Sequence, residues 1–73
     1  MQNSADIFSV VPLKGGWVVP NVRWPPVRFF SKEAAESYAR SLATQFAPSR
    51  LEILDAHGNV ESSTRYSQNP AGR

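Results

Sequence analysis

The stretch from Ser31 to Ala47, SKEAAESYARSLATQFA, decides the fold of the chain. Its apolar residues recur at the spacing i, i+3, i+4, i+7, i+8 and i+11, which places them along one side of an α-helix. The other positions are mostly charged or polar, so the opposite side of the helix should face water. The sequence therefore predicts one amphipathic helix whose apolar side is covered by the rest of the chain. The apolar positions are Ala35, Tyr38, Ala39, Leu42, Ala43 and Phe46.

Local signals mark both ends of this helix. Ser31 suits the N-cap, because its hydroxyl can accept a hydrogen bond from a free backbone N–H of the first turn. Glu33 follows where the helix dipole favours negative charge. Phe30 precedes the cap, and we expect it to pack weakly on Ala35 as a hydrophobic staple. The residue before Pro48 avoids helical backbone angles, so we expect the helix to end there.

The segments on either side of the helix predict short strands. They are rich in β-branched and aromatic residues or alternate apolar with polar side chains, and glycine-containing turns separate them. The predicted order is β-β-β-α-β-β, a single small α+β domain with an antiparallel sheet and one helix packed on one face. The last strand is polar and should lie at an edge. The expected strands are residues 7–12, 17–19, 27–30, 50–54 and 60–66.

Length and composition limit the chain to one small domain. A chain of 73 residues buries only about 60% of the surface that its unfolded form exposes, so its stability margin is thin. We expect the domain to span residues 7–66, between a disordered arm at 1–6 and a flexible tail at 67–73. Trp17, a large ring in a chain this short, is expected to anchor the core.

Composition also bears on the compartment and on partners. The chain has no cysteine, so neither a disulfide nor a thiolate metal site can stabilise it. No apolar run approaches the roughly 20 residues that span a membrane, and residues 1–6 lack the apolar core of a signal peptide. We therefore expect a cytoplasmic protein without a membrane partner. The net charge of +2 is a mild excess that permits weak attraction to polyanions without requiring it.

Five short motifs, in this order, resemble a small bacterial family called domain of unknown function 2188. Members of that family look like Val-x-Pro, Gly-Trp-x-Val, Phe-x-Ser/Thr-Lys-x-x-Ala, a His-Gly-x-x-Gly-like turn, whose second glycine is absent here, and a closing Tyr-x-x-x-Pro. The resemblance implies a compact domain and transfers no activity, because the family is uncharacterised. The corresponding segments here are Val10-Val11-Pro12, Gly16-Trp17-Val18-Val19, Phe29-Phe30-Ser31-Lys32-Glu33-Ala34-Ala35, His57-Gly58-Asn59-Val60 and Tyr66-Ser67-Gln68-Asn69-Pro70.

The sequence contains no credible catalytic or metal-binding set. His57 is the only histidine and Asp55 lies two residues before it, whereas catalysis needs a nucleophile or a second titrating group and zinc needs three or four ligands. We interpret His57 as a solvated turn residue and expect Asp55 to accept hydrogen bonds from backbone N–H groups of that turn. Gly15 and Gly16 precede a strand and not a helix, which favours a hairpin turn over a phosphate loop. We expect neither enzyme activity, nor a cofactor, nor a small-molecule substrate.

The favoured hypothesis is a protein-interaction or self-association module. Residues 20–26 contain three prolines, and a stiff loop that carries Arg23 and Trp24 beside Arg28 loses little entropy on binding. Tryptophan and arginine are the enriched anchors of protein interfaces. The sheet face without a helix, or an edge strand, could also pair two copies about a two-fold axis. The alternative for Trp24 is a lid folded over the core, with no partner implied.

Weak nucleic-acid binding is the second hypothesis. Arginine and lysine among aromatic residues can neutralise phosphates and stack on bases. The RNA-recognition-motif signature is missing, however, and the net charge is low for such a protein. The residues proposed for this role are Lys14, Arg23, Trp24, Arg28 and Arg65.

Overall fold

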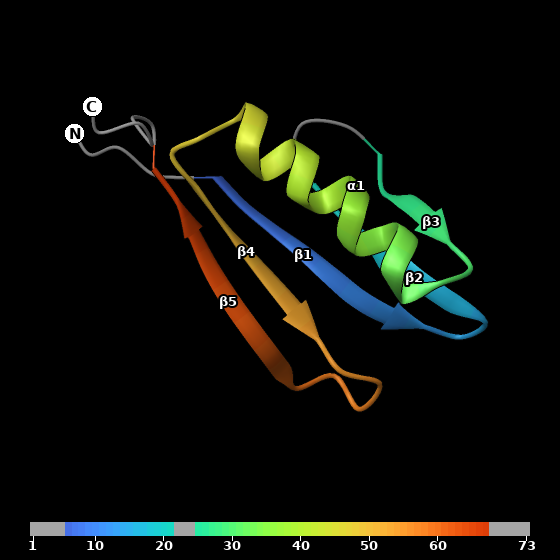
Figure 1. The fold of residues 1–73 in the computed structure, drawn as a ribbon. Helices are drawn as coiled ribbons and strands as arrows, with labels where there is room; N and C mark the ends of the chain where they lie inside the picture. Colours follow the sequence, from blue (N-terminus) through green and yellow to red (C-terminus); the bar gives the residue numbers. More distant parts are fainter. Residues whose placement is uncertain (1–5, 22–24, 68–73) are drawn as a thin grey trace.

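The computed structural model describes residues 6–21 and 25–67, which form one five-stranded sheet and one helix (Figure 1). The helix lies across one face of the sheet, so the predicted α+β class and the predicted order of elements are confirmed. The boundaries expected at residues 1–6 and 67–73 fall almost wholly outside the described ranges. The elements are β1 (Asp6–Leu13), β2 (Gly16–Val19), β3 (Val27–Phe29), α1 (Lys32–Gln45), β4 (Ser49–Leu54) and β5 (Val60–Tyr66).

The sheet is mixed, and the expectation of an antiparallel sheet is wrong for its central pair. The strand order is β3-β2-β1-β4-β5, and β1 pairs with β4 in parallel while all other pairs are antiparallel. The reason is the length of α1, whose 14 residues rise by about 21 Å. This carries the chain back to the end of the sheet where β3 began, so β4 must run in the same direction as β3 and β1.

Hydrogen bonds define both ends of α1. The Ser31 hydroxyl accepts a hydrogen bond from the Ala34 N–H at 3.1 Å, which confirms the predicted N-cap. At the other end the Phe46 N–H donates to the Leu42 carbonyl at 2.9 Å. The Ser49 hydroxyl, on β4, donates to the Ala43 carbonyl at 2.7 Å and is buried. The last turn of the helix is therefore attached to the first residue of β4.

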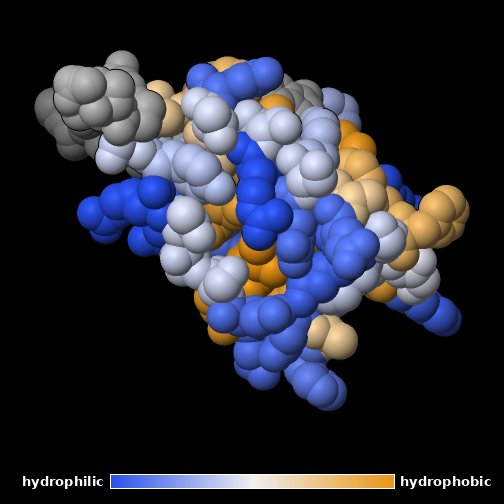
Figure 2. Space-filling view, in the orientation of Figure 1, coloured by the Kyte–Doolittle hydropathy of each residue, from blue (hydrophilic) through white to orange (hydrophobic). Residues whose placement is uncertain are grey.

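The apolar side of α1 packs on the sheet as its spacing predicts. Ala35, Ala39, Leu42 and Ala43 are buried, while Tyr38 and Phe46 lie half-buried beside them. Hydrophilic residues and residues of intermediate hydropathy, blue to white in Figure 2, cover the outer side of the helix. Hydrophobic surface is seen beside the helix. α1 is also too short and too polar to serve as a membrane span, and the described residues contain no other helix.

Alternate residues of the strands complete the core. Ring contacts join the sheet to the helix, with centroids 6.2 Å apart for Phe8 and Phe46 and 5.3 Å apart for Phe29 and Tyr38. Trp17, the expected core anchor, packs against this core but is only half-buried. The buried strand residues are Phe8, Val10, Val19, Leu51 and Ile53.

The predicted staple between Phe30 and Ala35 is wrong. Phe30 is 97% exposed. Side chains of a strand alternate between its two faces, and Phe29 already occupies the face toward α1, where it contacts Tyr38. Phe30 follows the last residue of β3 and leaves a large aromatic ring in water next to the helix cap.

Candidate interaction surface

The candidate site is the sheet face opposite α1, which we call the open face. The register of the strands places Val11 beside Val18, and Val18 beside Arg28 on β3. On the other side of β1, Val10 pairs with Ile53, so the residues that follow them, Val11 and Leu54, also lie side by side. Leu54 in turn pairs with Val60 on β5. The open face thus carries an apolar row that crosses four strands and ends at an arginine.

Part of this row is exposed to water. Val60 is 56% exposed, while Val11, Val18 and Leu54 are half-buried. Beside the row, Leu13 at the end of β1 is 38% exposed. Ile7, at the other end of β1, is 51% exposed. Single exposed apolar residues are ordinary, but a contiguous apolar patch rimmed by polar residues is typical of an interaction site.

Positive charge surrounds the apolar row. Arg50 and Glu52 lie on the open face of β4 and form an ion pair at 3.4 Å. Among the described residues, no carboxylate pairs with Lys14, Arg28 or Arg65. These three exposed cations are therefore the uncompensated charges of the face.

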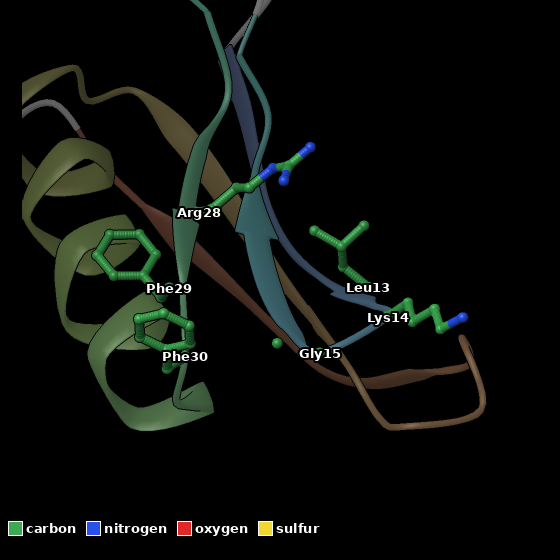
Figure 3. Close-up of a pocket in the computed structure, with 7 residues that line it drawn as sticks. Leu13, Lys14, Gly15, Arg28, Phe29 and Phe30 are labelled. Carbon is green, nitrogen blue, oxygen red and sulfur yellow. The ribbon is translucent and has the colours of Figure 1, made fainter.

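A hollow of about 380 Å³ lies at the end of the open face, beside the turn between β1 and β2 (Figure 3). Gly16 pairs with Leu13 at this level, and it supplies no side chain to fill the space. A Cβ at this position would lie too close to the backbone oxygen of Phe29, so the approach of β2 to β3 requires glycine. Gly15 occupies the turn with a φ of 84°, as predicted for a hairpin glycine. The hollow is lined by Leu13, Lys14, Gly15, Gly16, Arg28, Phe29 and Phe30.

The structure brings together only part of the predicted site. Lys14 and Arg28 both line the hollow, whereas Arg65 lies on β5, at the opposite edge of the sheet. Arg23 and Trp24, central to both hypotheses, fall outside the described residues. Neither the loop interface nor the lid over the core is therefore tested.

Two residues of the hollow escaped the sequence analysis. Leu13 lies just beyond the expected strand at residues 7–12, and Phe30 is predicted as a staple on the helix side. Phe30 lies one residue beyond β3, so the alternation of that strand does not decide on which side its ring lies. The signal for the hollow itself was absent, because it depends on the register that sets Gly16 opposite Leu13.

The turn between β4 and β5 behaves as the sequence predicts. A carboxylate oxygen of Asp55 accepts hydrogen bonds from the backbone N–H groups of His57 at 2.9 Å and Asn59 at 3.0 Å. These bonds, led by the one from Asn59, lower the pKa of Asp55 below its ordinary value of 3.8. His57 is exposed, and Gly58 has a φ of 88°. Within residues 6–21 and 25–67, no group of three His, Cys, Asp or Glu side chains is arranged to hold a metal ion.

Comparison with family models, curated proteins and solved structures gives no match for the chain.

Proposed function

We propose that the chain is a non-enzymatic protein-interaction module that binds a protein partner through its open face. The observation that supports this most directly is the apolar row across β2, β1, β4 and β5, which is not covered by the one helix of the described residues. A partner that buries this row would remove apolar surface from water at roughly 25 cal/mol per Å². The resemblance to domain of unknown function 2188 and a cytoplasmic location form part of this proposal.

The charges of the open face favour an acidic partner over a second copy. In a face-to-face dimer, the three uncompensated cations of each copy, Lys14, Arg28 and Arg65, would approach those of the other. Like charges at an interface oppose association. A partner that carries Asp or Glu beside its apolar residues would pair with the same cations. Self-association is therefore the less favoured form of the proposal.

Nucleic-acid binding is a second candidate, supported by one arrangement. Lys14, Arg28 and the exposed ring of Phe30 line one hollow, as a stacking platform for a base would require. Two observations favour a protein partner. Arg65 is separated from Arg28 by four strand spacings, or about 19 Å. The face between them carries the apolar row and the paired Arg50 and Glu52, whereas nucleic-acid affinity depends mainly on phosphate neutralisation.

Selection from a random peptide library displayed on phage tests the proposed function. We expect the immobilised chain to enrich peptides that combine Asp or Glu with large apolar residues. Binding should be lost when Val11→Thr and Val18→Thr are combined, because threonine keeps the branched shape and strand propensity but places hydroxyls in the apolar row. Ser41→Ala, on the outer side of α1, is the control and should leave binding unchanged.

Three results would overturn the proposal. They are a failure to enrich any peptide, equal binding of the selected peptides to the double variant, and a concentration-dependent dimer in sedimentation that the double variant dissociates. The last result would replace the acidic partner by a second copy of the chain. Circular dichroism of each variant confirms that a loss of binding is not a loss of fold.

A further inference from the structure

The hollow beside the β1–β2 turn is more specific in shape and charge than the rest of the open face. We propose that it is an anchor subsite for one large apolar side chain, flanked by carboxylates, in an acidic segment of the partner. This inference rests on the proposed function and adds to it the position of the anchor and the kind of sequence that binds there.

The walls of the hollow suit an apolar group. Leu13 and the exposed ring of Phe30 supply apolar surface, Phe29 adjoins Gly16 with its backbone, and the two glycines of the turn leave space between them. The volume of about 380 Å³ is near the lower end of the range of roughly 300–1,000 Å³ for ligand pockets. A hollow of this size fits one side chain better than a large cofactor.

The charged residues around the hollow all have the same sign. Of the residues that the structure describes, Lys14 and Arg28 line it and no acidic residue does. Lys14 comes from the turn between β1 and β2, whereas Arg28 comes from β3 on the other side of Gly16 (Figure 3). Carboxylates on either side of an inserted apolar residue would therefore each meet a cation.

The hollow is preformed by the backbone. Gly16 is fixed by the close approach of Phe29, and β2 and β3 are paired from the next position onward, Trp17 with Phe29 and Val18 with Arg28. A site built on paired strands orders few additional groups when it binds, so less of the interaction energy is offset by lost entropy. The exposed ring of Phe30 is the side chain with most freedom to adjust to the guest.

A peptide is favoured over a nucleotide because of the number and spacing of the cations. The hollow offers two cations, and the third cation of the face, Arg65, lies at the far edge of the sheet. A single strand that crossed the face would therefore neutralise few phosphates. An apolar side chain with two neighbouring carboxylates uses every feature of the hollow.

Titration of the isotope-labelled full chain with the peptide Gly-Ser-Asp-Phe-Asp-Ser-Gly, followed by NMR, tests the inference. We expect shifts at the residues that line the hollow. Charge reversal by Lys14→Glu or Arg28→Glu should weaken binding about fivefold, in line with the loss of an exposed ion pair. Replacing the phenylalanine of the peptide by serine should weaken it about tenfold or more. The matched control, Arg65→Glu, makes the same charge change at the other sheet edge and should change affinity less than about twofold.

The outcomes separate this inference from the proposed function. If Arg65→Glu and Arg28→Glu weaken binding of the peptide equally, an acidic partner remains supported but the anchor subsite is refuted. The same holds if the serine peptide binds as well as the parent. No shift with this peptide, while library peptides still bind, would also overturn the subsite alone. If a short oligothymidylate binds more tightly than the peptide, and its binding weakens steeply with salt, the partner of the hollow would be a nucleic acid and not a peptide.

Discussion

Replacing Ser49 by alanine should destabilise the domain far more than its small change in volume indicates. Its hydroxyl donates to the carbonyl of Ala43 at 2.7 Å, and the residue is 1% exposed. Ala43 lies in the last turn of α1, where carbonyl groups lack partners within the helix. Ser49→Ala therefore leaves a buried acceptor without a donor, which costs about 1–3 kcal/mol.

Thr44 provides a matched control on the same helix. Its hydroxyl donates to the carbonyl of Arg40 at 2.9 Å, a bond of nearly the same length, but the residue is exposed. Water can replace this bond, and alanine has the higher helix propensity by a few tenths of a kcal/mol or more. We expect Thr44→Ala to be neutral or slightly stabilising.

Urea denaturation followed by tryptophan fluorescence measures both variants. With a slope of about 1 kcal/mol per M for a domain of this size, Ser49→Ala should lower the midpoint by roughly 1–3 M. Thr44→Ala should leave the midpoint unchanged or raise it slightly. Equal midpoints for the two variants would show that burial does not determine how much these hydrogen bonds contribute to stability, and would refute the reasoning.

Two further predictions concern the core and the β4–β5 turn. Leu42→Ala removes a buried side chain of α1 and should lower the free energy of unfolding by about 2–5 kcal/mol. Circular dichroism should then show that much of the protein is unfolded, and a fully folded variant would contradict the packing of α1. Because the folded-state pKa of Asp55 is lowered, its contribution is complete above pH 3.8 and is lost as pH falls through the lowered value. Urea midpoints should therefore fall on acidification more steeply for the parent than for Asp55→Asn, and parallel curves would refute this.

The helix and the strands were predictable because each has a strong local pattern. A stripe of six apolar residues at helical spacing, with Ser31 before it and Pro48 after it, leaves little choice of structure. The strands follow from alternation and from glycine-containing turns. These signals act over a few residues, so they survive in a single sequence without knowledge of the tertiary contacts.

The parallel pairing of β1 with β4 was not predictable by the same means. No local pattern states which strand lies beside which, and the pairing depends on the path of the chain over the sheet. The length of α1 contained the relevant information, because a helix as long as the sheet returns the chain to its starting end. The hollow was hidden for the same reason, since it arises only where the register brings Gly16, Leu13 and Phe30 together.

The apolar row on the open face has a simpler explanation that must be weighed against a binding role. Val11, Val18 and Val60 are β-branched, and such residues favour strands whatever they contact. That explanation does not extend to Phe30, which follows the last residue of β3 and is 97% exposed. Strand propensity gives no reason for this ring, the neighbouring helix does not use it, and the core is closed by Phe29 instead. Among the described apolar residues outside the core, Phe30 is thus one for which a partner supplies a physical reason, and it lines the hollow together with Lys14 and Arg28.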